Sequence, residues 1–178
     1  MLTDLPPGPI SPGLEQAYFE LRSAGYKPIL AHPERHRELS KQPEQIDRLR
    51  EQDLLIQINA GSLLGRFGRR AQAAAEMLLE RGWSDFIGSD AHDLEKRPLS
   101  LLGQARERVL QLCGEVEVDR LFRRNPACAI SGDDILRGEE SSRSPTKPRP
   151  RRRGGLTRRR KKEKAGIFQR LLGRMTDR

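Results

Sequence analysis

Three short apolar runs, each followed at once by polar residues, are the feature that most constrains how this chain can fold. The runs occupy residues 28–31, 54–58 and 85–88, and segments with helical spacing of apolar residues separate them. Strands that alternate with helices in this way indicate βαβ units and a parallel sheet. The sequence therefore predicts an α/β fold in which polar side chains gather where the strands end.

Apolar spacing and end signals locate the helices between these strands. A helix that begins near residue 14 should end at Gly25. Another should begin at Pro43, with Ile46 and Leu49 on its inner face. The remaining predicted elements are helices over 67–79, 98–113 and 116–122 and a final turn at Asn125-Pro126.

Positive charge is concentrated at the C-terminal end of the chain. Residues 141–178 hold 15 Lys and Arg and 2 Asp and Glu, out of 34 and 25 in the whole chain, which leaves 19 and 23 for residues 1–140. The first part of the chain is therefore mildly acidic. We predict a folded domain over 1–138, a disordered linker over 139–157, and a basic tail over 158–178 with a short amphipathic helix.

The basic tail can bind a polyanion, and three partners are open. An anionic membrane surface ranks first, because Phe168, Leu171 and other apolar residues recur at helical spacing among arginines. Nucleic acid ranks lower, because the basic run has no interleaved aromatic residues for base stacking. The third partner is an acidic segment of another protein. Two cysteines without paired spacing, and no signal-peptide pattern, favour a cytoplasmic location, peripheral to the inner membrane if the tail binds lipid.

Imidazole and carboxylate groups follow two of the predicted strands. His32 follows the first run, and Asp90 and His92 follow the third. These donors suit manganese, iron or zinc. On an extended segment the side chains of Asp90 and His92 would leave from the same face, so that they could serve one metal ion or bridge two. The spacing alone leaves a structural alternative open, in which His32 caps its strand and Asp90 and His92 form a hydrogen-bonded pair.

Two arginines lie close in sequence to these donors. Arg35 comes three residues after His32, and Arg97 comes five residues after His92. A guanidinium group binds the non-bridging oxygens of a phosphate in a bidentate manner. Either arginine taken singly could be an ordinary surface residue. Their shared relation to the donors favours a phosphate ester as the ligand.

Three strings of this chain carry a resemblance, namely Pro28–Arg35, Gln57–Gly65 and Gly88–His92. Together they resemble the PHP superfamily and, more narrowly, the manganese-dependent bacterial protein-tyrosine phosphatases encoded with capsule and exopolysaccharide genes. The resemblance covers about residues 2–135. It implies that residues 1–138 are a partial PHP phosphatase domain, the later part of a distorted (β/α)₇ barrel. It also implies hydrolysis of phosphotyrosine by metal-activated water, with a membrane-bound tyrosine kinase as the substrate.

The resemblance also implies roles for individual residues. By position, the metal ligands are Asp4, His32, Asp90 and His92, and the catalytic residues that hold the phosphoryl group are Arg35 and Arg97. Family members begin with a His-x-His pair and further His and Glu ligands upstream of the first residue of this chain. We therefore expect a shortened enzyme or a remnant, with an incomplete multinuclear manganese (or iron or zinc) cluster and little hydrolysis.

Two other functions fit the same sequence. One keeps the fold and replaces the substrate with a small phosphomonoester such as histidinol phosphate. The other is a non-catalytic protein that binds polyanions through its basic tail. The string Ala31–Arg35 favours the phosphotyrosine phosphatase over the small-molecule phosphatase, and the non-catalytic alternative stays open.

Overall fold

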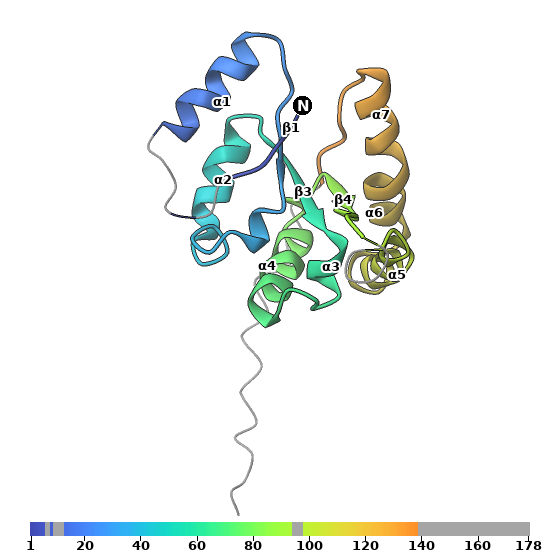
Figure 1. The fold of residues 1–178 in the computed structure, drawn as a ribbon. Coiled ribbons are helices and arrows are strands. Elements are labelled where there is room, and N and C mark those ends of the chain that lie inside the picture. The colour runs from blue at the N-terminus through green and yellow to red at the C-terminus, as the bar shows by residue number, and fades with distance from the viewer. Residues whose placement is uncertain (6–7, 9–12, 94–97, 139–178) are drawn as a thin grey trace, which may run out of the picture. The chain divides into compact units, whose positions relative to one another are not determined.

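A single parallel sheet organises the structure, a computed structural model that describes residues 1–5, 8, 13–93 and 98–138. The predicted α/β class is confirmed. Every neighbouring pair of strands is parallel, and the strands follow one another in chain order (Figure 1). They are β1 (Leu2–Thr3), β2 (Ile29–Ala31), β3 (Leu55–Asn59) and β4 (Phe86–Gly88).

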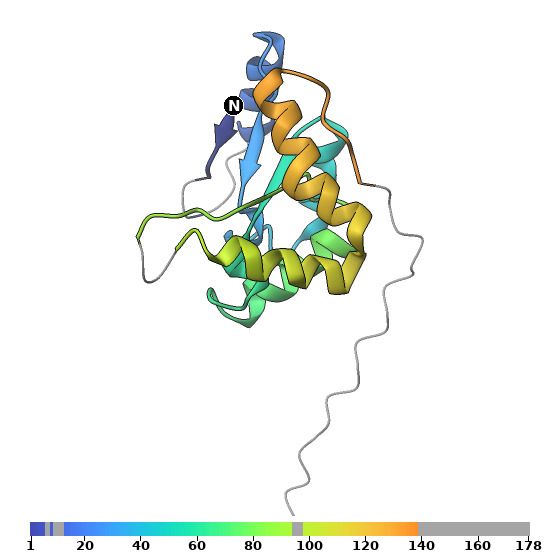
Figure 2. The same ribbon diagram turned by 90° about the vertical axis from the view of Figure 1, so that its right-hand side faces the viewer.

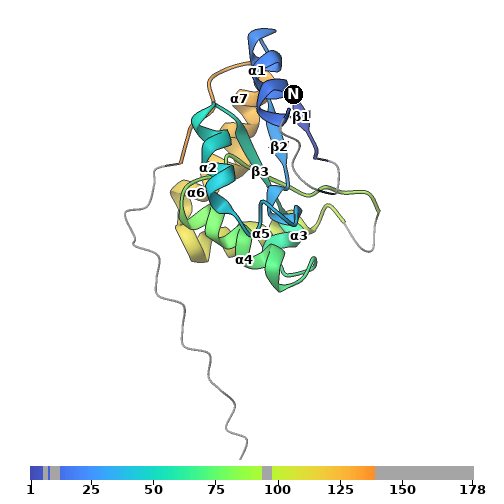
Figure 3. The same ribbon diagram turned by 90° about the vertical axis from the view of Figure 1, so that its left-hand side faces the viewer.

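Helices connect each strand to the next and continue after the last one. Figure 2 shows α5, α6 and α7 in the foreground, and Figure 3 shows α2 in front of β3. Within the described ranges, no helix is long and apolar enough to cross a membrane. The helices are α1 (Leu14–Ser23), α2 (Pro43–Glu51), α3 (Ala60–Leu63), α4 (Arg69–Glu80), α5 (Leu101–Cys113), α6 (Glu115–Asp119) and α7 (Asn125–Ser131), with a 3₁₀ turn η1 (Pro33–Arg35) and a π-helical turn η2 (Arg120–Arg124).

Alternate residues of β3 and its approach carry the hydrophobic core. Leu54, Ile56 and Ile58 share one face, because side chains of a strand alternate between two faces. They belong to one buried cluster with the inner faces of the helices, as the spacing of apolar residues predicted. The helical members of this cluster include Ile46, Leu49, Ala75, Leu78, Ala105, Val109, Val118 and Leu121.

A helix occupies the position where the sequence predicted a final turn at Asn125-Pro126, so that prediction was wrong. The backbone of Asn125 is helical, and α6, η2 and α7 follow one another without an interruption. Pro126 lies in the first turn of α7. A proline is tolerated there, and the π-helical turn before it adjusts the hydrogen bonding that its missing N–H would otherwise disrupt.

Asn125 fastens the last described segment to the amino end of the sheet. It is fully buried, and its Nδ2 donates to the backbone oxygens of Asp85 (2.8 Å) and Leu136 (2.9 Å). Its Oδ1 accepts a hydrogen bond from the backbone N–H of Leu136 at 3.0 Å. Arg120 adds hydrogen bonds to the backbone oxygens of Leu136 and Ser84. This polar network lies at the end of the sheet opposite to the carboxyl ends of the strands.

A buried carboxylate joins β3 and β4 at the same end. Asp85 is fully buried, and its Oδ2 accepts hydrogen bonds from the backbone N–H of Ile56 (2.8 Å) and from Arg137 Nη1 (3.0 Å). Burial raises the pKa of Asp85 above its ordinary value, although Arg137 and the Ile56 N–H lower it. The folded chain therefore favours the protonated form of this residue more than the unfolded chain does.

Replacing Asn125 with alanine should lower the free energy of unfolding by about 1–3 kcal/mol, because buried backbone groups would lose their partner. Urea denaturation measures this change. The matched control is Arg123→Ala, whose side chain is 80% exposed and pairs only at the surface with Asp119. That variant should lose less than about 1 kcal/mol. Equal losses in the two variants would contradict the role given to Asn125.

The raised pKa of Asp85 predicts a pH dependence that Asp85→Asn removes. The unfolded chain releases this proton near pH 4, at about the ordinary pKa of aspartate, whereas the folded chain retains it to higher pH. The stability that Asp85 contributes is therefore fully present below about pH 4 and is lost as the pH rises through the folded pKa. The free energy of unfolding of the wild type minus that of the variant, from urea denaturation, should fall from pH 4 toward neutrality. A constant or rising difference would refute this prediction.

Candidate functional site

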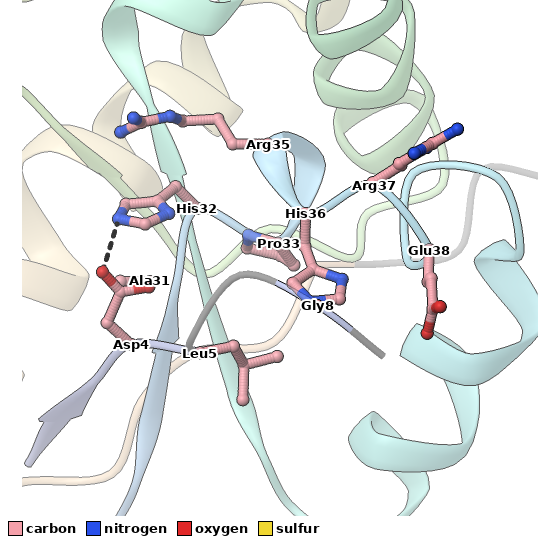
Figure 4. Close-up of a pocket in the computed structure, with 10 residues that line it drawn as sticks. All are labelled: Asp4, Leu5, Gly8, Ala31, His32, Pro33, Arg35, His36, Arg37 and Glu38. Atoms are coloured by element: carbon pink, nitrogen blue, oxygen red, sulfur yellow. Dashed lines mark ion pairs between the residues drawn. The ribbon is translucent and has the colours of Figure 1, made fainter. Parts of the chain in front are cut away.

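The carboxyl ends of the four strands place polar side chains at one edge of the sheet. Asp4 follows β1, His32 follows β2, Asn59 ends β3, and Asp90 lies two residues after β4. Asp4, His32, Gln57 and Asp90 line a cavity of about 470 Å³. A neighbouring cavity of about 590 Å³ shares Asp4 and His32 (Figure 4). Its remaining lining residues include Arg35, His36 and Arg37.

Asp4 and His32 form the first pair of donors. His32 Nε2 lies 3.3 Å from Asp4 Oδ2, as the dashed line in Figure 4 marks. The backbone of His32 is left-handed, with φ 37°, and its N–H donates to the backbone oxygen of Gln57 at 2.7 Å. A left-handed residue directly before Pro33 ends β2 abruptly and turns the chain into η1. The imidazole ring thus lies at the strand end that the sequence predicted.

Arg35 and Asp90 form the second contact of the site. Arg35 Nη1 donates to Asp90 Oδ2 at 2.9 Å, and Asn59 Nδ2 donates to the same oxygen at 3.0 Å. The Arg35 guanidinium also lies 4.3 Å from the centre of the Phe67 ring, where the ring face attracts a cation. A planar cation, a carboxylate and a buried amide are therefore held together at the strand ends.

The side chains of Asp90 and His92 lie beside each other, although the segment that carries them is not extended as the spacing argument assumed. Asp90 has φ 49°, which is left-handed rather than extended. The chain turns back, and His92 Nδ1 lies 2.7 Å from the backbone oxygen of Asp90 and 3.4 Å from its Oδ1. This contact is the hydrogen-bonded pair that the structural alternative described. Arg97 falls outside the described residues, so its role stays a prediction.

Glu34 is a residue of the site that sequence reasoning did not identify. It is fully buried in η1, and its Oε1 accepts hydrogen bonds from the backbone N–H of Asn59 (3.1 Å) and from Ser62 Oγ (2.6 Å). Burial raises the pKa of Glu34 to about 7, although these hydrogen bonds lower it. Because η1 turns tightly, Glu34 points inward while the next residue, Arg35, reaches Asp90.

The sequence of the segment after β3 indicates part of the site, namely the positions of Asn59 and Gly61. Asn59 is the N-cap of α3, and its Oδ1 accepts a hydrogen bond from the backbone N–H of Gly61 at 2.8 Å. Asparagine is among the favoured residues at an N-cap. A Cβ atom at Gly61 would lie 2.8 Å from the Phe67 ring, so glycine is required for this ring to approach. No local signal pointed to Glu34, because a glutamate beside an arginine is typical of a solvated surface.

The donor chemistry of this edge fits a divalent cation. Imidazole and carboxylate groups from three strand ends, His32, Asp4 and Asp90, face one cavity, and such groups bind manganese, iron or zinc. Within residues 1–5, 8, 13–93 and 98–138, however, no three His, Cys, Asp or Glu side chains come close enough to hold one ion together. The described residues thus provide donor pairs rather than a full set of ligands.

Two curated proteins that are similar in sequence to this chain are both named as tyrosine-protein phosphatases. Tyrosine-protein phosphatase YwqE of Bacillus subtilis (strain 168) is 40% identical over 83 residues, which cover 47% of this chain and 33% of the relative. Tyrosine-protein phosphatase CpsB of Streptococcus agalactiae serotype III (strain NEM316) is 29% identical over 106 residues, or 57% of this chain and 43% of the relative.

A solved structure is similar over most of the described fold. It comes from crystal structures of YwqE from Bacillus subtilis and CpsB from Streptococcus pneumoniae, described as metal-dependent tyrosine phosphatases. It superposes with a TM-score of 0.70 and 29% identity, and the match covers 79% of this chain and 57% of that one.

The family comparison covers nearly the whole folded part. The model of the family described as "Capsular polysaccharide synthesis, CpsB/CapC" matches residues 2–131. This chain spans between 33% and 43% of the length of the two curated relatives given above. With its parallel sheet and the donor pairs at the strand ends, the chain belongs to the CpsB/CapC family of capsular polysaccharide synthesis.

Proposed function

We propose that this chain holds the phosphoryl-binding residue Arg35 and part of the metal-binding residues of a metal-dependent tyrosine phosphatase of capsule synthesis. The fold would then be the later part of a (β/α)₇ barrel of the PHP type. The observation that carries the proposal is the contact of 2.9 Å between Arg35 Nη1 and Asp90 Oδ2, beside the pair of Asp4 and His32. The Arg35 guanidinium, which would bind the phosphate, lines one cavity. The donors for a metal ion, Asp4, His32 and Asp90, line the neighbouring one.

A phosphate ester needs both of these features. The guanidinium of Arg35 can bind two oxygens of a phosphoryl group and stabilise the charge that they carry during hydrolysis. Phe67 holds the guanidinium from one face, and Asp90 holds it at its edge. The side chain of Arg35 is 30% exposed, which leaves part of it accessible to a ligand.

The metal would be manganese, with iron or zinc as alternatives. When bound, such an ion lowers the pKa of a coordinated water to about 7 and thereby supplies a nucleophile. Asp4 and His32 would hold one ion, and Asp90 would contribute a carboxylate oxygen. His92 and Arg97 remain candidate ligand and phosphoryl-binding residues, respectively, from the family resemblance.

The names of the relatives support phosphotyrosine as the substrate. YwqE and CpsB are named as tyrosine-protein phosphatases, and this favours a phosphotyrosine protein over histidinol phosphate. A membrane-bound tyrosine kinase of the capsule system is the partner that we propose. The site of action would be the cytoplasm.

Replacing Arg35 with lysine should weaken Mn²⁺-dependent binding of a phosphotyrosine peptide by about tenfold to a hundredfold. Lysine keeps the charge but loses the planar fork and its stacking on Phe67, and a charged hydrogen bond is worth about 1.5–3 kcal/mol. Isothermal titration calorimetry with Mn²⁺, and with EDTA in its place, measures the affinity. The control Arg106→Lys changes an arginine that pairs with Glu115 on the surface, and its affinity should match that of the wild type.

Two outcomes would count against the proposed function. One is binding that is equal with Mn²⁺ and with EDTA, and the other is an Arg35→Lys variant that binds as tightly as the wild type. Phosphate release from the bound peptide separately tests the expectation of little hydrolysis. A rate that EDTA abolishes would support the proposed function and contradict that expectation.

The basic tail should bring the chain to anionic membranes. Residues 139–178 lie outside the described part of the structure, so this prediction rests on their composition. The full chain should co-sediment with vesicles that contain phosphatidylserine, and a chain that lacks residues 156–178 should not. Equal co-sedimentation with neutral phosphatidylcholine vesicles would contradict the prediction. Loss of vesicle binding in the presence of RNA would indicate nucleic acid as a competing partner.

A further inference from the structure

We propose that Asn59 is a positioning residue of this site, whose side-chain amide fixes the carboxylate of Asp90 and, through Asp90, the guanidinium of Arg35. The inference rests on the proposed function, because it assigns Asn59 a task in the same site. Its basis is the hydrogen bonding of one buried amide group and of the backbone that carries it.

Both ends of the Asn59 amide are engaged, so the amide has a single favourable orientation. The residue is 1% exposed. Its Oδ1 accepts a hydrogen bond from the Gly61 N–H at 2.8 Å, and its Nδ2 donates to Asp90 Oδ2 at 3.0 Å. A reversed amide would place its NH₂ against the Gly61 N–H and its oxygen against the carboxylate, which are two repulsive contacts. The backbone N–H of Gly61 therefore ensures that Asn59 presents a donor to Asp90.

The backbone of Asn59 is itself held in place. Its N–H donates to Glu34 Oε1 at 3.1 Å, and the Ser62 hydroxyl donates to the same oxygen at 2.6 Å. Glu34 directly precedes Arg35 in η1. The two groups that hold Asp90 are thus both anchored to Glu34, Asn59 by a hydrogen bond and Arg35 by the peptide chain.

Both of these donors hold the same oxygen of Asp90. Asp90 lies beyond β4 in a left-handed backbone conformation, which few residues other than glycine adopt. Arg35 and Asn59 both donate to its Oδ2, while its Oδ1 lies 3.4 Å from His92 Nδ1. With its rotation fixed, the Asp90 carboxylate presents an oxygen to a metal ion at a defined place. Removing a hydrogen-bond partner of this kind typically weakens metal binding by about 10- to 100-fold.

Asn59→Ser tests the proposal, because serine also caps a helix but is too short to reach Asp90. The first readout is Mn²⁺ affinity of the purified chain, measured from the electron paramagnetic resonance signal of free Mn²⁺. The second is hydrogen exchange of the Arg35 guanidinium in metal-free chain, followed by ¹H–¹⁵N NMR. We expect affinity to fall by about tenfold or more, exchange to accelerate, and the thermal midpoint to stay near that of the wild type.

Two reference variants separate positioning from stability. Asp90→Asn removes the carboxylate itself and should change both readouts. Asn125→Ala removes another fully buried asparagine, at the opposite end of the sheet, and should lower stability while leaving both readouts at wild-type values. If Asn59→Ser does not fold, Asn59→Thr takes its place, because threonine also keeps the capping oxygen.

Each outcome decides the proposal. Wild-type affinity and wild-type exchange in Asn59→Ser, with both altered in Asp90→Asn, would overturn it. If Mn²⁺ binds the wild type and Asp90→Asn equally, the metal part of the proposed function is wrong. Exchange of the Arg35 guanidinium then decides the positioning role alone. Faster exchange in Asn59→Ser supports the role, and unchanged exchange refutes it.

Discussion

One oxygen of the buried Glu34 carboxylate joins two segments of this site, η1 and the start of α3, beyond the hydrogen bonds of the sheet. The pairing of β2 with β3 ends at Ala31 and Gln57, with one further hydrogen bond from the His32 N–H to the Gln57 oxygen, whereas Arg35 and Asp90 lie beyond these bonds. Glu34 Oε1 connects η1 to the start of α3 through Asn59 and Ser62. Arg35 and Asn59 reach Asp90 from these two segments. Removing that oxygen would take away this direct connection, although Leu63 of α3 would still be buried in the core.

The two ends of the sheet have separate tasks. Asn125, Arg120 and Asp85 hold the amino ends of the strands to the last helices and to the segment that follows them. The carboxyl ends carry the polar groups of the site, among them the half-buried His32 and Asp90 with strained, left-handed backbones. Strain of this kind is typical of functional sites, and it persists only where the surrounding structure is well anchored. At the carboxyl ends, the hydrogen bonds of the buried Glu34 to Asn59 and Ser62 provide such an anchor.

Most of the fold could be predicted from sequence because its signals are local. The three apolar runs became β2, β3 and β4, and Pro43 begins α2 with Ile46 and Leu49 buried. The turn predicted at Asn125-Pro126 failed, because a proline permits a helix start as readily as a turn. Which of the two forms depends on the buried partners of Asn125, and these lie up to 40 residues away along the chain.

The site was less predictable for the same reason. His32, Arg35 and Asp90 were identified because each follows a strand, and the topology brings them to one edge. The hydrogen bond between His92 and the backbone oxygen of Asp90 depends on a left-handed backbone at Asp90 that no spacing rule contains. The hydrogen-bond partners of Glu34 lie 25 and 28 residues further along the chain. No residue near Glu34 in the sequence therefore indicates that its side chain is buried.

Neighbouring residues in η1 have different surroundings, and this limits how the loop can evolve. Glu34 is buried, while Arg35 reaches Asp90. Substitutions in this loop change one side chain at a time. The deletion of one residue before Glu34, in contrast, would move the arginine into the buried position, and the insertion of one residue there would move the glutamate to the position that now contacts Asp90. The segment between β2 and Arg35 can therefore vary in composition more readily than in length.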